Sequence, residues 1–518
     1  MPVRTAVFDR ATFVFAALLL LLTGLRIAGL RETPLDLHFD EAQYWAWSRT
    51  LEWGYFSKPP LIAWAIALTT SVFGDAEWAV RLASPIAQGL TALALFALGR
   101  SVYGAWAGFW AGLAWLTIPG VFLSSAIMST DALLLPCWGL ALFAAWRLIA
   151  TRGWVWAIAL GLAVGLGALA KYAMLYFVLC AAIAAWWWRP AREALKSRQG
   201  ATAAAVALAV LSPNLYWNFG HSFATVAHTA SNASLSPDFI NPEEWLEFTL
   251  SQAAVIGPLF FVALLWLILR TLGRASGLRD EDKFLLSFFV PPMLIVMGIA
   301  FVSRANANWA VVAFPAALVW LTGQLSVGKR GRRFLAAATA IHLALGGLMG
   351  AAWLNPEFAN QIGAANAFKR SRGWEETARE IALRAVAQPG EAPFTAVLVD
   401  HRALYYELSY YWRTARRAGA PLPPVRMWQL HADARNSAEQ SDPMRVEEGA
   451  RVLVVHMNGG MLPVVAGDFT AFRPVEHLSI PLGGDINREL EISIGEGFAP
   501  APRDEAFETR LQALSQPN

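Results

Sequence analysis

The sequence predicts a polytopic α-helical membrane protein with a small α/β domain at its C-terminal end. Three observations support this fold class. The 518-residue chain is 56% hydrophobic and only 15% charged, and its mean hydropathy is +0.42. Apolar runs of about 20 residues, long enough to cross a bilayer, recur as far as residue 353. Beyond that point the chain becomes polar and mixes helical with strand-like patterns.

The apolar runs predict about 11 transmembrane helices. The shorter stretch 61–73 is predicted to be a helix that lies at the membrane interface. No small-x-small cleavage motif follows the first run, so we expect it to remain as the first span. The predicted spans are 12–30, 80–99, 104–123, 131–150, 154–170, 172–188, 201–218, 248–269, 284–302, 307–325 and 334–353.

Basic residues predict how these spans are oriented. Most Lys and Arg residues of the predicted loops fall on one side, which the positive-inside rule makes cytoplasmic. The N-terminus is then expected inside, and the chain beyond residue 353 outside. The basic residues left on the outer side are Arg31, Arg49, Lys58, Arg81, Lys171 and Arg304.

Two domains follow from this pattern. Residues 1–353 form a transmembrane module with an outward-facing first loop, 31–79, and residues 354–518 form the α/β domain. In the second domain "FTAVLVD" and "RVLVVHM" predict buried strands, and "GWEETAREIALRAVA" and "HRALYYELSYYWR" predict helices. The net charge of +3 gives no indication of a nucleic-acid partner.

Ionisable residues at the outer ends of the spans are the candidate functional residues, because a charge at a membrane boundary is costly unless it is paired or hydrated. The first loop contains "HFDEAQYWAW", in which Asp40 and Glu41 are adjacent. Adjacent carboxylates repel each other and a helix cap needs only one, so a structural role explains this pair poorly. The other candidates are Lys58, Arg81, Asp131, Lys171 and Arg304.

Several of these residues have a structural alternative. Asp131 can be a helix N-terminal acid that the helix macrodipole favours. Lys171 and Arg81 can be snorkelling side chains at helix ends. Arg304 can anchor a helix end, and Tyr44 can belong to an interfacial aromatic belt.

The transfer of a sugar from a membrane-embedded phosphate carrier uses all these groups. A carboxylate base activates the acceptor hydroxyl, and Asp40 with Glu41 beside it provides one. Cations hold the carrier phosphate and offset the negative charge that grows on it as it leaves. Lys58, Lys171 and Arg304 are the candidates for that role.

"FDEAQY", "KPPL", "FG...RL", "TDALLLP" and "LAKY", in this order, resemble motifs of the bacterial GT-C glycosyltransferases, near the aminoarabinose transferase of lipid A and the protein O-mannosyltransferases. The resemblance covers roughly residues 12–325. It implies an inverting transfer from a polyprenyl-phosphate sugar to a glycolipid such as lipid A, a polysaccharide or a protein, at the outer face of the bacterial inner membrane. The C-terminal domain would then be periplasmic.

The resemblance also implies roles for individual residues. Asp40 falls at the first-loop aspartate of the family and Lys58 at the lysine of its Lys-Pro-Pro motif. Glu41, Asp131 and Lys171 fall at other motif positions. Arg304 is assigned by its chemistry alone. The residues expected to bind substrate are Lys58, Asp131, Lys171, Arg304, Tyr44 and Arg81.

One residue departs from the pattern. Aminoarabinose transferases read Asp-Glu-Ala-Arg-Tyr, whereas Gln43 replaces the arginine here. The loss of a cation beside the base puts aminoarabinose in doubt as the donor sugar and weakens the assignment of lipid A as the acceptor. No cofactor is expected, although Asp40, Glu41 and Asp131 have the oxygen ligands that suit a divalent cation.

The sequence is also compatible with other functions. A transporter or flippase for a lipid-linked sugar would show inverted repeats or ionisable residues near the bilayer midplane, but the charges here lie at span ends. A structural partner of envelope proteins accounts for the outer domain but not for the acidic pair. An acyl or phosphoryl transferase ranks lower, because no Gly-x-Ser-x-Gly arrangement occurs in the predicted outer loops.

Overall fold

The computed structural model describes residues 9–223, 225, 240–273, 277–386, 390–457 and 459–515. The chain forms two compact units. The first, here called the membrane unit, comprises Met1–Glu32 and Leu51–Gly350. The second, here called the α/β unit, comprises Thr33–Thr50 and Ala351–Asn518. The segment Thr33–Thr50, which contains Asp40 and Glu41, therefore belongs to the α/β unit.

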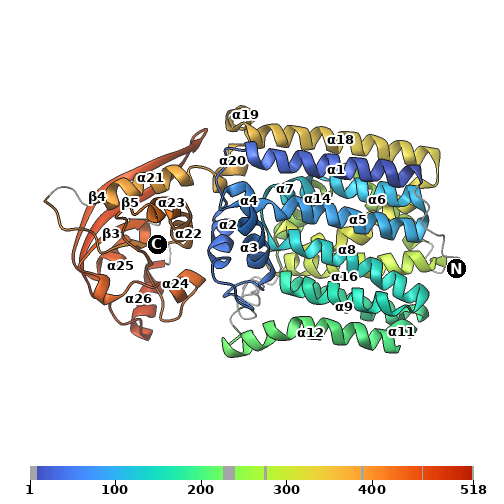
Figure 1. Cartoon of the computed structure of the whole chain (residues 1–518), viewed down its shortest axis with the longest axis horizontal. Helices are drawn as coiled ribbons and strands as arrows, with labels where there is room; N and C mark the ends of the chain where they lie inside the picture. Colours follow the sequence, from blue (N-terminus) through green and yellow to red (C-terminus); the bar gives the residue numbers. More distant parts are fainter. Residues whose placement is uncertain are drawn as a thin grey trace. The chain divides into compact units, whose positions relative to one another are not determined.

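Helices are the only regular secondary structure of the membrane unit among the described residues (Figure 1). In the part of the chain that the structure describes, six helices are long and apolar enough to cross a membrane, or up to eight if each bent pair is one span. The chain is thus a multi-pass membrane protein. Its elements are α1 (Arg10–Glu32), α3 (Leu61–Phe73), α4 (Glu77–Arg81), α5 (Ala83–Tyr103), α6 (Ala105–Thr117), α7 (Pro119–Ala126), α8 (Thr130–Thr151), α9 (Trp154–Ala170), η1 (Tyr172–Met174), α10 (Leu175–Trp187), α11 (Arg189–Leu195), α12 (Arg198–Gly220), α14 (Pro242–Ile256), α15 (Pro258–Leu272), α16 (Asp280–Val302), η3 (Ala307–Ala313), α17 (Phe314–Ser326) and α18 (Lys329–Leu354).

Two predicted spans are broken, and the prediction of one continuous helix for each was wrong. The predicted span 248–269 is the pair α14 and α15, bent by 114°. Gly257 between them has φ +87°, which a continuing helix cannot adopt, and Pro258 has no N–H to extend α14. The predicted span 104–123 is the pair α6 and α7, bent by 57° at Ile118, whose extended conformation is typical of the residue before a proline.

Small residues allow the helices to pack closely. Helices α5, α8, α9 and α12 follow one another as neighbours (Figure 1). Gly161 of α9 faces α12, where an added Cβ would lie 2.6 Å from the carbonyl oxygen of Ala203. Close approach through small residues is a general source of helix association in membranes.

The α/β unit is built on a five-stranded sheet of order β2-β1-β3-β5-β4. β1 pairs in parallel with β2 and β3, and the β4–β5 hairpin extends the sheet antiparallel to β3. Its main elements are α2 (Phe39–Trp47), α21 (Trp374–Ala385), β1 (Ala396–Val399), α22 (Arg402–Tyr411), β2 (Val425–Met427), β3 (Arg451–His456), β4 (Phe469–Gly483) and β5 (Ile486–Phe498). The shorter ones are α19 (Pro356–Gln361), α20 (Ala365–Phe368), η4 (Lys369–Ser371), α23 (Arg413–Arg417), α24 (Ser437–Ser441), η5 (Val446–Glu448), η6 (Gly459–Met461), α25 (Leu462–Ala466) and α26 (Glu505–Ser515).

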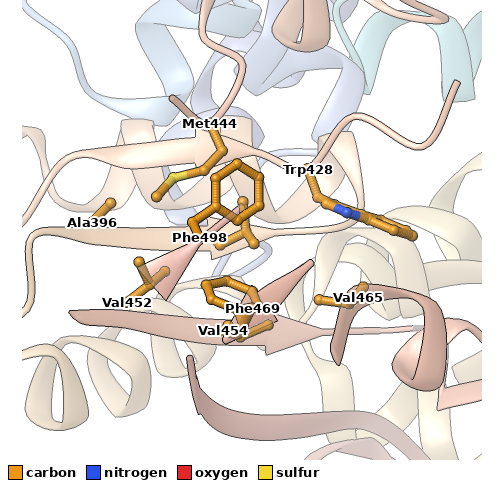
Figure 2. Packing of buried hydrophobic residues seen from close by; sticks show 9 residues of the cluster. Ala396, Trp428, Met444, Val452, Val454, Val465, Phe469 and Phe498 are labelled. Atoms are coloured by element: carbon orange, nitrogen blue, oxygen red, sulfur yellow. The ribbon is translucent and has the colours of Figure 1, made fainter. Parts of the chain in front are cut away.

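One face of this sheet carries an apolar core. Alternate residues of β1 and β3 point to that face, where Phe469 and Phe498 of the hairpin pack on them (Figure 2). The predicted strands and helices of this region are present as β1, β3, α21 and α22. The hairpin was not predicted, because Pro474 and Pro481 in β4 weaken its strand pattern.

The segment Thr33–Thr50 is joined to the α/β unit along its length. Thr33 Oγ1 donates to the carbonyl oxygen of Trp353 at 3.0 Å. Asp36 accepts the backbone N–H of Trp374 at 2.6 Å, so it caps the first turn of α21. Further hydrogen bonds join Leu37 N–H to the Tyr411 hydroxyl at 3.1 Å and Trp47 Nε1 to Ser437 Oγ at 3.1 Å.

Candidate active site

Helix α2 begins with a capping box that separates the roles of the two adjacent carboxylates. His38 is the N-cap, and its Nδ1 accepts the backbone N–H of Asp40 at 3.1 Å. The Glu41 carboxylate accepts the backbone N–H of His38 at 2.9 Å, and Glu41 is 0% exposed. Glu41 therefore helps to fix the start of the helix, whereas the Asp40 side chain is 38% exposed.

The Asp40 carboxylate is paired on one side only. Arg402 Nη1 donates to Asp40 Oδ1 at 2.8 Å. Oδ2 lies 3.8 Å from His38 Nδ1, which already accepts a hydrogen bond and so cannot donate one. Burial lowers the pKa of His38, which keeps this imidazole neutral at pH 7. Among the described residues no donor reaches Oδ2, and this oxygen is available to an incoming hydroxyl.

Arg402 contacts the face of α2 that carries Asp40 and Gln43. It is the first residue of α22, which directly follows β1, and it also donates to Gln43 Oε1. Its guanidinium lies 4.7 Å from the centre of the Phe39 ring. Sequence reasoning missed Arg402, because 362 positions separate it from Asp40 and nothing in "HRALYY" indicates a partner.

A second carboxylate, Asp131 of the membrane unit, accepts a hydrogen bond on each oxygen. Lys171 Nζ donates to its Oδ1 and Asn308 Nδ2 to its Oδ2, each at 2.7 Å. Asp131 lies in the first turn of α8, capped by Ser129, and Lys171 follows the last residue of α9. Because the consecutive helices α8 and α9 are antiparallel neighbours, the start of α8 lies beside the end of α9. The side chains of Asp131 and Lys171 are 12% and 26% exposed.

Lys58 lies at the end of a loop that is anchored to α12. The backbone carbonyl of Lys58 accepts the N–H of Tyr55 at 3.0 Å, which closes a turn. Earlier in the loop, Asn214 Nδ2 donates to the carbonyl oxygen of Trp53 at 2.6 Å, and Asn214 is fully buried. The sequence contained a signal for Asn214 that was not used, since a polar residue inside an apolar span is uncommon.

The network extends from that loop to the residue after Lys171. The Tyr172 hydroxyl donates to Asn214 Oδ1 at 2.9 Å and accepts from Asn218 Nδ2 at 3.0 Å. Hydrogen bonds thus connect the loop before Lys58, α12 and the α9–α10 junction. The positions of Lys58 and Lys171 are both supported by this buried polar network.

The remaining predicted residues differ in accessibility. Arg304 is exposed in the segment between α16 and η3, and it forms no hydrogen bond or ion pair with any residue that the structure describes. Arg81, at the end of α4, is 0% exposed. Tyr44 is buried in α2, with its ring centre 5.5 Å from that of Trp47. Arg304 is accessible for direct contact with a ligand, whereas Arg81 and Tyr44 lie inside the protein.

One cavity of the membrane unit is lined almost entirely by apolar side chains. It has a volume of about 420 Å³ and is lined by apolar side chains of α8, α9, η1, α10, α11, α12 and α16, among them Met174, Phe284 and Phe288. None of the predicted site residues lines it. It can hold hydrocarbon but supplies no acid, base or cation. Over the described ranges, no group of three or more His, Cys, Asp or Glu side chains is placed to hold a metal ion.

Comparison with known proteins identifies relatives of the chain. Residues 57–217 match the family model described as dolichyl-phosphate-mannose-protein mannosyltransferase. The chain is 36% identical to the lipid A galacturonosyltransferase RgtD of Rhizobium johnstonii over 409 residues. This alignment covers 77% of this chain and 83% of RgtD.

Two solved structures share the fold. They are crystal structures of ArnT from Cupriavidus metallidurans, one bound to undecaprenyl phosphate and one in the apo state. Their TM-scores are 0.59 and 0.58, with identities of 16% and 15%, and the matches cover 95% of this chain and 99% and 98% of theirs. The fold is that of a membrane glycosyltransferase. The chain belongs to the GT-C glycosyltransferases related to ArnT and the protein mannosyltransferases.

Proposed function

We propose that this glycosyltransferase moves a sugar, with inversion, from a polyprenyl-phosphate donor to lipid A or a closely related glycolipid. The observation that carries the proposal is the geometry of Asp40. Its carboxylate is exposed, oriented by Arg402 through one oxygen and open at the other. A general base needs an accessible oxygen in a fixed position, and Asp40 has one.

The reaction balances with this one base. The acceptor hydroxyl oxygen attacks the anomeric carbon, and its proton passes to Asp40. The bond between the anomeric carbon and the phosphate oxygen breaks, and its electron pair leaves on the polyprenyl phosphate. Attack opposite to the leaving group inverts the anomeric configuration, and no covalent enzyme intermediate is needed. Glu41, buried in the capping box, acts by positioning Asp40.

Cations of the membrane unit are proposed to hold the donor phosphate. Arg304 is exposed and unpaired among the described residues, so its guanidinium can contact phosphate oxygens directly. Lys171 is held by Asp131, which fixes its ammonium group, and Lys58 lies in an anchored loop. Positive charges placed in advance stabilise the negative charge that develops on the leaving phosphate. Arg81 is fully buried, so we assign it a structural role at the end of α4 and no direct contact with the donor.

The donor sugar and acceptor are proposed from the curated relative. RgtD is a lipid A galacturonosyltransferase, so we infer a hexuronic acid as the sugar and lipid A as the acceptor. Gln43 supports a donor other than aminoarabinose, because it replaces the arginine of the motif that the sequence otherwise resembles.

The membrane topology is part of the proposal. About 11 spans, with the broken pairs α6–α7 and α14–α15 each counted once, would place the N-terminus in the cytoplasm and residues 354–518 on the periplasmic side of a bacterial inner membrane. The first loop, 31–79, would lie on the same side as that C-terminal region. The acceptor and the carrier phosphate would then meet Asp40 at the membrane surface.

Mass spectrometry of envelope lipids provides the test. Cells lacking the protein are complemented with wild type or with Asp40→Asn, at matched membrane levels. A hexuronic acid on lipid A that returns only with wild type supports the proposal. If Asp40→Asn restores the same lipid profile, Asp40 is not the base. A flippase would behave differently, because it would alter the lipid-linked sugar pool and not only lipid A.

A further inference from the structure

The α/β unit makes one charged contact with the exposed carboxylate of α2. Asp40 and Arg402 both lie within this unit, and the distance between Oδ1 and Nη1 is 2.8 Å. The same Nη1 donates to Gln43 Oε1. Residues 40 and 43 are three apart on a helix and therefore lie on one face. A single guanidinium nitrogen thus spans both side chains.

The position of Arg402 is fixed from the side of the sheet. Strand β1, central between β2 and β3, ends at Val399, and two residues separate it from the start of α22. His401 caps α22, since its Nδ1 accepts the N–H of Ala403 at 3.1 Å. The loops after parallel strands on either side of a switch in strand order are where α/β sheets place functional groups. Here that loop presents Arg402 to α2.

We propose that Arg402 is a positioning residue for sugar transfer, through which the α/β unit orients the Asp40 carboxylate and directs Oδ2 to the acceptor hydroxyl. This inference rests on the proposed role of Asp40 as the base. It also assigns a function to the α/β unit, which presents the base through α2 and the β1–α22 loop. Other charged groups near Asp40 are His38 at the cap and Glu41 in the same turn, with Arg370 also acting on His38.

A charge-swap experiment tests the proposal. Initial rates are measured on purified full-length protein with undecaprenyl-phosphate galacturonate as donor and lipid A as acceptor. Arg402→Gln removes the ion pair but keeps an amide beside Gln43. We expect kcat to fall about 10- to 100-fold, because a misplaced reacting group costs this much, while the donor KM changes little. Arg402→Lys, which keeps one charged donor, should retain most of the activity.

The double variant Gln43→Arg/Arg402→Gln exchanges the two partners. The guanidinium then comes from position 43, one turn from Asp40 on the same face of α2. We expect activity to return to within about 5-fold of wild type, since the cation beside the base is restored. Arg379→Gln is the matched control, because Arg379 of α21 pairs only on the exposed surface of the same unit.

The outcomes separate the two proposals. If Asp40→Asn is as active as wild type, the proposed base is wrong. If Asp40→Asn is inactive but Arg402→Gln has normal kinetics, only the role of Arg402 is wrong. If Arg402→Gln folds poorly, the swapped variant decides, because a folded but inactive swap also overturns the role of Arg402.

Discussion

Two aspartates, one in each unit, form ion pairs of nearly the same length but lie in different surroundings. Asp131 in the membrane unit accepts Lys171 and Asn308 on its two oxygens, and its side chain is 12% exposed. Asp40 in the α/β unit accepts Arg402 on one oxygen, and its side chain is 38% exposed. The pairing distances, 2.7 and 2.8 Å, do not distinguish them.

The difference lies in the second oxygen. A carboxylate that accepts a hydrogen bond on each oxygen and is mostly buried leaves a substrate hydroxyl little access to its remaining lone pairs. A carboxylate with one open oxygen is oriented and still able to accept. The comparison supports the proposed division of roles, in which Asp131 holds Lys171 in place and Asp40 takes the proton. An ion pair beside an aspartate therefore does not by itself identify a catalytic residue.

The largest effect is expected for Asp40→Asn. An amide still accepts a hydrogen bond from Arg402 but cannot take a proton, so kcat should fall about 10²- to 10⁴-fold, as is typical for the loss of a general base. Thermal unfolding should change little, because a half-exposed ion pair contributes less than about 1 kcal/mol. Initial rates and unfolding curves of the same preparation give both values. A large loss of stability would assign Asp40 to the fold.

Asp131→Asn should show the reverse pattern. Lys171 would lose its charged partner in a mostly buried place, which lowers the free energy of unfolding by about 1–3 kcal/mol. The rate should fall only about 10-fold, because Lys171 moves but the base remains. Adding Lys171→Met removes the unpaired charge, so the double variant should recover stability without activity. A double variant less stable than either single one would contradict this account.

The cationic side chains also differ in pairing: Lys171 is bound to Asp131, whereas Arg304 is exposed. Arg304 has no partner among the described residues, so Arg304→Gln should leave stability unchanged and weaken donor binding about 5- to 10-fold through the loss of a charge-assisted contact to phosphate. Binding of undecaprenyl phosphate in nanodiscs measures this effect. Arg270→Gln, at the end of α15, is a suitable control on another exposed arginine. Unchanged donor affinity in Arg304→Gln would remove this residue from the phosphate site.

Lys58→Ala tests the anchored loop. The turn at Lys58 is closed by backbone atoms, so alanine should leave it intact while the ammonium group is lost. We expect the donor KM to rise several-fold, by about as much as for Arg304→Gln, with a smaller change in kcat. Normal donor kinetics in this variant would argue against contact between Lys58 and the donor phosphate.

Much of the fold could be predicted, because its signals are local. Hydropathy placed helices along the membrane unit, and the short strands β1 and β3 followed from their apolar runs. The break at Gly257 was missed because the apolar pattern continues through it, although Gly-Pro was a visible signal. The β4–β5 hairpin was missed because its outer face is polar and contains prolines.

The candidate site was predictable only in part, and the reason is sequence distance. Motifs drew attention to Asp40, Asp131 and Lys171, each of which is charged at a span end. The residues that bind these side chains could not be predicted from local motifs, because Arg402 is 362 positions from Asp40 and Asn308 is 177 positions from Asp131. A local sequence cannot show which oxygen of a carboxylate stays open, because that depends on groups brought together by the fold.

The smallest effect expected is on the pH dependence of stability. Burial lowers the pKa of His38, although the negative charges of Asp40 and Glu41 act to raise it. The unfolded chain therefore binds a proton at this histidine near pH 6.5, whereas the folded protein binds it only at lower pH. Stability therefore falls as the pH drops below that value. His38→Asn keeps a good N-cap and cannot titrate, so it should make the acid-side fall shallower, with a change below about 1 kcal/mol at neutral pH.

His477→Gln provides the opposite sign in the same measurement. Hydrogen bonds to Glu491 and Glu489 raise the pKa of His477, so its contribution is present at low pH and is lost as the pH rises through the folded-state value. Its removal should make the acid-side fall steeper. Protonation of His38 would also replace its acceptor nitrogen with a donor 3.8 Å from Asp40 Oδ2. At acid pH Asp40 would then have a cationic donor near each oxygen, and His38→Asn should retain more of its activity at pH 5.5 than wild type does.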